Sequence, residues 1–446
     1  MKKFFIYTGI IIAIFVLVYF GLGFWLVQST GARVAAGRDQ IKAAGDKVYL
    51  TDYETDPIPD DENAYHYLML AKADLEAFDN DHSEVYELYE IQRDVPDEQI
   101  EQFAKIVEKY PAMYEHLEQA AACGTYRPDY DYSQGMMMLM PEVNLFRNAA
   151  RAFSLKALVE AHRGNGDAAL NQAGYSLRVS HHLQNPPTIV DDLVRIACQA
   201  IATLSANHTL RVAETSPEAR ERLDRILAAI DNKQSGIDAM KGERACGIQT
   251  FQQMRDGTLN PDGMGVDGLS HMTLLNSTWL GQAYLNDDEA KYIELLDKQI
   301  EACELPRAER EALLEPFCEE FEESRFRHLF TRLLVPALNA AANASDRAEA
   351  NLRCLRILLA IEGQDSFDIE NIDLPAAVKA DPYSDGLLKI VMKDGEPVVY
   401  SIYENEIDDG GHVFNTEPES YDQPLDQGFG PLGEALEIEN PELGPE

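Results

Sequence analysis

The start of the chain contains the feature that most constrains its fold. Residues 4–27 read FFIYTGIIIAIFVLVYFGLGFWLV, carry no charge and follow Lys2 and Lys3. A helix rises about 1.5 Å per residue, so a helix of this length crosses the roughly 30 Å of hydrocarbon in a bilayer. A helix also satisfies its own backbone hydrogen bonds, as the lipid interior requires. The run therefore predicts a single transmembrane helix over residues 4–27.

A cleaved signal peptide is the alternative for this segment. The apolar core of a signal peptide spans about 7 to 15 residues and ends near a small-x-small site. The run here is longer, and the nearest such site, residues 34–36, lies well past Val27. The sequence favours an uncleaved anchor in the inner (cytoplasmic) membrane. The short tail of residues 1–3 favours a cytoplasmic N-terminus, which places the rest of the chain on the periplasmic side, although basic residues are nearly balanced across the span.

The overall charge is strongly acidic. The chain has 77 Asp and Glu against 38 Lys and Arg, for a net charge of −39. Such a surface repels phosphate backbones, which argues against nucleic-acid binding. It attracts divalent cations and basic partners, but solubility explains it equally well. Composition indicates no cofactor.

The six cysteines contain no CxxC pair, which argues against a zinc knuckle or a thioredoxin-type motif. In an oxidising compartment disulfides are allowed, and Cys303 and Cys318 flank an expected turn at residues 305–306, where they would join a helical hairpin. The alternative is a fully reduced set of structural cysteines. Cys198 lies in an apolar helical run and is expected to be buried.

Composition divides the rest of the chain into four parts. These are a juxtamembrane segment at 28–56, an α-helical hairpin domain at 57–365, a small β subdomain at 366–413 and a disordered acidic tail at 414–446. The predicted fold class is mainly α: a transmembrane helix, antiparallel helical hairpins of solenoid type, a small β-hairpin and the tail.

Proline and acidic residues predict several helix starts, at residues 57–63 and 94–97, at Pro111 and at residues 216–218. After the first start, apolar residues recur at helical spacing and are expected to face the core. They are Ala64, Leu68, Ala71, Leu75 and Phe78.

The clearest helical hairpin lies between residues 145 and 204. A break at residues 164–167 separates two helices, and Asp167 is expected to cap the second one. The inner face of that second helix is expected to run through Leu177 to His181.

The pattern changes near the C-terminus. Residues 387–392 and 397–402 are rich in β-formers, and residues 393–396 between them predict a hairpin turn. A sheet of two or three strands would be marginal alone, so we expect it to pack on the last long helix.

Residues 158–177, LVEAHRGNGDAALNQAGYSL, resemble the turn of one tetratricopeptide (TPR) repeat, although the 34-residue period is missing. This TPR-like resemblance implies antiparallel helices that stack on their neighbours. Together with residues 57–64 and 381–411, the turn at 164–170 also resembles a group of uncharacterised bacterial membrane-anchored helical proteins. That group implies no known activity.

Residues 381–411 are also similar to the C-terminal end of type II secretion pseudopilins, where an Asp-rich loop holds calcium. The similarity implies Asp408, Asp409 and Asn405 as calcium ligands. The chain departs from the pattern at Glu404 and Glu406, where Gly and Asp are usual. An exposed acidic turn is the alternative, because calcium takes six to eight oxygens and this spacing completes no known coordination set.

Other candidate sites have simpler explanations. His181 and His182 are adjacent, so they cannot chelate one metal from the same helix, and a buried core role is expected for His181. The methionines at 136–138 and 140 suit Cu(I), but gap-filling between helices is the more common use. Residues 255–268 lack the acids of an EF-hand and predict a surface loop.

No nucleophile–base motif, phosphate-binding loop or zinc motif is present in the sequence. The sequence therefore indicates a membrane-anchored extracytoplasmic protein that acts as a scaffold for protein partners. One alternative is an unrecognised hydrolase-type enzyme with a pocket between the helices and the 255–268 loop. The other is a calcium-responsive module at the C-terminus.

Overall fold

The computed structural model describes residues 2–82, 94–138, 140, 142–183, 187–259, 278–323, 327–364, 367–413 and 425–433. Within its helices, the side chains at 2–6, 8–9, 11–13, 15–16, 318, 321–323 and 334–336 lie outside the description. The fold is mainly α-helical with a small three-stranded antiparallel sheet, which confirms the predicted class at that level.

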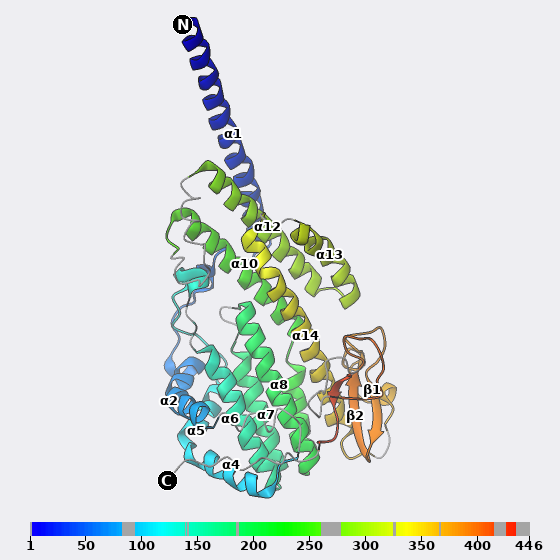
Figure 1. Cartoon of the computed structure of the whole chain (residues 1–446). Helices are drawn as coiled ribbons and strands as arrows, with labels where there is room; N and C mark the ends of the chain where they lie inside the picture. The colour runs from blue at the N-terminus through cyan, green and yellow to red at the C-terminus, as the bar shows by residue number, and fades with distance from the viewer. Residues whose placement is uncertain are drawn as a thin grey trace.

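Helix α1 (Lys2–Ala43) is the longest helix of the described chain. Its first half projects from the body, and its second half packs along α12 (Trp279–Cys303), as Figure 1 shows. Among the described residues, no helix is long and apolar enough to cross a membrane. The predicted span, residues 4–27, includes many of the side chains that lie outside the description.

The body consists of helices of very different lengths, and α14 joins its upper and lower parts (Figure 1). The remaining α-helices are α2 (Ala64–His82), α4 (Asp97–Lys109), α5 (Pro111–Ala122), α6 (Val143–His162), α7 (Gly166–His181), α8 (Ile189–Val212), α9 (Pro217–Ala228), α10 (Asn232–Asp256), α13 (Arg307–Glu323), α14 (Leu329–Ile361) and α15 (Ala376–Lys379). Short 3₁₀ helices lie at Leu50–Tyr53, Asp60–Glu62, Tyr132–Met137 and Ile369–Asn371.

Three large apolar clusters hold these helices together. The first joins α2, α4, α5 and α6, the second joins α7, α8, α9, α14 and the sheet, and the third joins α10, α12 and α14. All five core positions predicted for α2 are fully buried. Burial of this apolar face stabilises the packing of α2 against its neighbours, because the removal of apolar area from water is the main favourable term in folding.

Local signals place several helix starts as predicted. Pro111 opens α5, and Ser216 precedes Pro217 at the start of α9, where the Ser216 hydroxyl accepts a hydrogen bond from the Ala219 amide. Helices α6 and α7 pack against each other across the short turn at 163–165. This is a helical hairpin; its resemblance to a TPR repeat stays a prediction.

Two details of that hairpin were predicted wrongly. Asp167 does not cap α7: Asn165 holds the cap position, and the Asp167 carboxylate instead binds Ser216 at the start of α9. His181 is exposed rather than buried, because it lines an open hollow together with residues of α5 and α9.

The sheet contains β1 (Lys389–Lys393), β2 (Glu396–Ser401) and β3 (Gln427–Phe429). The hairpin turn at Asp394 and Gly395 has φ of 53° and 86°, the positive values that a two-residue turn between twisted strands requires. The sheet packs on α14, as predicted.

Strand β3 contradicts the prediction of a disordered tail for residues 425–433, because this segment returns to pair with β2. Residues 414–424 and 434–446 of the predicted tail lie outside the described chain.

The described cysteines Cys123, Cys198, Cys246, Cys303 and Cys354 are free thiols. Cys198 is fully buried, as predicted. The side chain of Cys318 lies outside the description, so its pairing with Cys303 is untested.

Candidate functional site

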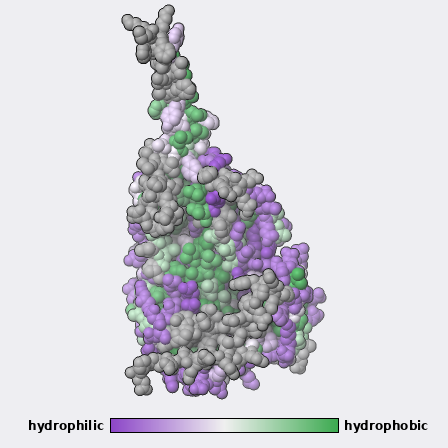
Figure 2. Space-filling view, viewed as in Figure 1, coloured by the Kyte–Doolittle hydropathy of each residue, from purple (hydrophilic) through white to green (hydrophobic). Residues whose placement is uncertain are grey.

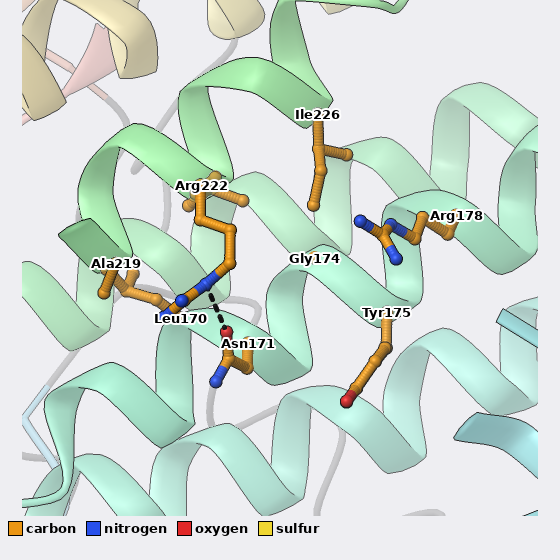
Figure 3. A pocket seen from close by; sticks show the side chains of 9 residues that line it. Leu170, Asn171, Gly174, Tyr175, Arg178, Ala219, Arg222 and Ile226 are labelled. Atoms are coloured by element: carbon orange, nitrogen blue, oxygen red, sulfur yellow. Dashed lines mark hydrogen bonds between the residues drawn. The ribbon is translucent and has the colours of Figure 1, made fainter. Parts of the chain in front are cut away.

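A groove between α7 and α9, closed at one end by the end of α5, is a hollow surface with both apolar and charged lining. It consists of two adjoining hollows of about 290 and 520 Å³. They share Arg178, Arg222 and Ile226, so we treat them as one surface, the α7–α9 groove. Figure 3 shows the smaller hollow, with α7 side chains on one side and α9 side chains on the other.

Small residues and one carboxylate bring α7 and α9 together. A Cβ on Gly174 would lie 2.9 Å from the Ile226 side chain, so glycine permits the close approach. At the start of α7, both Asp167 carboxylate oxygens accept hydrogen bonds from Ser216, one from its amide and one from its hydroxyl, each at 2.7 Å. These bonds lower the pKa of Asp167 and tie the first turn of α9 to α7.

The floor of the groove is apolar and continuous with the second core cluster. Leu170, Leu177 and Leu223 are buried, and Ile226 and Ile230 are half-buried beside them. A bound segment would therefore bury its own apolar side chains against a preformed surface, which is the main source of affinity in such grooves.

The walls of the groove carry positive charge. The lining residues include Arg178, Arg222 and Arg225, all exposed, and no Asp or Glu. Arg222 donates a hydrogen bond of 3.2 Å to the Asn171 side chain, the dashed line in Figure 3. Arg225 lies 3.7 Å from the exposed Glu221, a contact of little energy. In a chain of net charge −39, this is a local reversal of sign.

Two histidines line the larger hollow. His182 donates from Nε2 to the Ala120 carbonyl at 3.1 Å and stacks on Tyr126. Burial lowers the pKa of His182. The pKa of His181 is also lowered, by the protein atoms that partly enclose its ring and by the charge of Arg195. Both rings are therefore mainly neutral at neutral pH, and the arginines supply the charge of the groove.

The predicted calcium residues lie together on one loop after β2. Asp408 accepts hydrogen bonds from Lys389 at 2.7 Å and from the Tyr400 hydroxyl at 2.9 Å. The bond from Lys389 is the main reason that the pKa of Asp408 is lowered. The Asn405 amide donates to Asp409 at 3.0 Å. A cation at this loop would compete with Lys389 for Asp408.

Sequence reasoning missed Asp426, which organises the same loop. Its carboxylate accepts hydrogen bonds from the backbone amides of Asp409, Gly411 and His412. It lies just before β3, in the segment taken for a disordered tail. Among the described residues no group of three or more His, Cys, Asp or Glu is placed to hold a metal ion. The calcium site stays a prediction.

The remaining candidates add no site. Met138 is buried in a cluster with Leu50 and Tyr132, in agreement with the gap-filling role. Most of the 255–268 loop, from residue 260 on, lies outside the described chain, so the pocket expected beside it is untested.

The groove itself was not predicted. Arg222 and Arg225 lie one turn apart on α9, a visible signal, but nothing local in the sequence indicates that α9 faces Arg178 on α7. Comparison with protein-family models, curated proteins and solved structures gives no match to this chain.

Proposed function

We propose that the chain is a single-pass membrane-anchored scaffold protein. Residues 4–27 of α1 hold it in the inner (cytoplasmic) membrane with the N-terminus in the cytoplasm. The helical body lies on the periplasmic side and binds an acidic, partly apolar segment of a partner protein in the α7–α9 groove.

The exposed side chains of α1 support the anchor. Of the described residues in the 4–27 run, Leu17, Phe20 and Phe24 are 72%, 63% and 69% exposed. Apolar area in water costs roughly 25 cal/mol per Å², so a soluble chain gains nothing by such a helix. Figure 2 shows apolar side chains on the part of α1 between the grey atoms and the body.

The observation that carries the binding role is the reversed charge of the groove. An acidic partner is repelled by most of this chain, so it gains favourable electrostatic energy only where the arginines lie. The arginines select the partner and its orientation, while the apolar floor supplies affinity. A basic or neutral segment would gain no favourable electrostatic energy in the groove.

A site-specific photocrosslinker at the exposed groove residue Ala229, in the full chain in its native membrane, tests the binding role. The expected result is a crosslink to a defined segment rich in Asp and Glu with apolar residues between them. The double variant Arg178→Glu/Arg222→Glu should abolish that crosslink. Arg163→Glu, which changes an exposed arginine outside the groove, should preserve it.

A crosslink that survives the double variant, or one to a segment without acids, would refute the groove as the binding site. Protease treatment of intact spheroplasts tests the location separately. The body should be digested from outside while the bilayer is intact; protection until the cells are lysed would contradict the proposed topology.

A further inference from the structure

We propose that the body is seated directly on the lipid surface, and that the first turn of α12, Trp279 and Leu280, enters the interface of the leaflet from which α1 emerges. This inference rests on the anchor in the proposed function and adds a second membrane contact from a distant part of the chain. Its ligand is the interfacial layer of a phospholipid bilayer.

The start of α12 lies beside the apolar run of α1. The rings of Tyr19 and Trp279 are 4.9 Å apart in an edge-to-face arrangement. A Cβ on Gly23 would lie 2.5 Å from the Trp279 ring, so the indole lies directly on the glycine backbone. Both contacts involve residues inside the 4–27 run, and in Figure 1 one end of α12 lies beside α1.

The helix rise gives the depth of this contact. Gly23 and Tyr19 lie four and eight residues before Val27, which is about 6 and 12 Å along the helix axis at about 1.5 Å per residue. Trp279 therefore lies level with the last two turns of the predicted span. Tryptophan is enriched at this depth because its ring is amphipathic.

Exposed apolar side chains surround this level. Leu280 is 54% exposed, and Trp25 of α1 is 62% exposed. Further along α1, the exposed Arg33 contacts Asp287 of α12, and the exposed Arg327, from the segment before α14, contacts the same carboxylate. An apolar and aromatic level followed by an arginine level is the order found at the boundary between acyl chains and phosphate headgroups.

The two helices cannot easily slide past each other. Gly37 of α1 lies against Ile293 of α12, where a Cβ would approach to 3.2 Å. Arg38 donates two hydrogen bonds to the fully buried Glu289 of α12. The depth of α1 in the bilayer therefore determines the depth of Trp279.

The chain contains two tryptophans, Trp25 and Trp279, so each can be observed alone. Full-length Trp25→Phe and Trp279→Phe would be reconstituted in phosphatidylcholine vesicles with bromine at defined acyl-chain depths, and tryptophan quenching measured. Because Trp25 is exposed, its replacement by Phe leaves the packing intact. We expect the shallowest brominated lipid to quench Trp279 within about twofold of its effect on Trp25.

In the Trp25→Phe background, Leu280→Asp should weaken this quenching and shift the Trp279 emission to the red. Leu387→Asp, which changes an exposed leucine near the sheet, should alter neither. Quenching of Trp25 without quenching of Trp279 would overturn the seated body and leave the anchor standing. If neither tryptophan is quenched, the anchor in the proposed function fails as well.

Discussion

The ion pair between α1 and α12 gives the sharpest stability prediction. Glu289 has no exposed surface in its side chain, and Arg38 and Arg255 both contact its carboxylate, each at 2.5 Å at the closest approach. The substitution Glu289→Gln keeps the size of the side chain and removes its charge. Both guanidinium groups then remain near an apolar helix interface without a counter-ion.

The expected cost follows from burial. Removing one partner of a buried ion pair destabilises proteins by about 3–5 kcal/mol, mainly because a charge is left unpaired. Arg38 and Arg255 are 18% and 21% exposed, so each retains some contact with water. We therefore expect a loss of about 3 kcal/mol, near the lower end of that range.

Urea unfolding of the full chain in detergent, followed by circular dichroism, measures this loss. The matched control is Glu294→Gln on the same helix, because Glu294 is 49% exposed in its pair with Lys291. Lys291 is buried but keeps its closer contact with Glu320, at 2.6 Å, in this variant. The half-exposed Glu294 contributes less than about 1 kcal/mol, so the control should resemble the wild type. If the two variants lose the same stability, the argument that burial makes the Glu289 pair structural is wrong.

Three further predictions concern other parts of the fold. Gly242→Ala on α10 should destabilise the protein by at least about 1–3 kcal/mol in the same urea titration, because the added Cβ would lie 1.8 Å from a backbone oxygen. The matched control Gly236→Ala places its Cβ in open space, so it should raise the free energy of unfolding by up to about 1 kcal/mol. Burial raises the pKa of Asp191 to about 6, so ionisation of this carboxyl opposes folding. As the pH rises from about 4 to 6, the free energy of unfolding of the wild type should fall by about 3 kcal/mol relative to that of Asp191→Asn. Above about pH 6 the difference between the two proteins should stay constant. If the C-terminal loop binds calcium, Lys389→Met should tighten calorimetric calcium binding by freeing Asp408, and an absence of calcium heat in both proteins would end that prediction.

Local signals predicted the helices well because their causes are local. Pro111 and Ser216 act within one turn of the helices they begin, and the apolar spacing of α2 depends only on the helical period. The hairpin turn at 394–395 is likewise set by the conformations its own residues adopt. For these elements the sequence contains the whole physical reason.

Contacts between distant segments could not be predicted from local signals. Asp167 was predicted to cap its own helix, but its carboxylate instead accepts hydrogen bonds from the hydroxyl and the amide of Ser216. The composition around Asp426 indicated disorder, but three backbone amides bind its carboxylate and β3 pairs with β2. Composition measures the average preference of a segment, whereas each of these contacts depends on a partner far away in the chain.

The end of the predicted span shows the same distinction within a single helix. Hydropathy changes at Val27, so the sequence indicates a boundary there, but the backbone of α1 continues as a helix to Ala43. Hydropathy reports which solvent the side chains prefer and carries no information on whether the backbone hydrogen bonds stop. The helix continues because Gly37 lets α12 approach and Glu289 neutralises Arg38. If residues 4–27 anchor the chain as proposed, an anchor helix that ended at Val27 would leave the body free to tilt on a flexible linker. A continuous helix packed on α12 would instead give the groove a defined orientation relative to the bilayer.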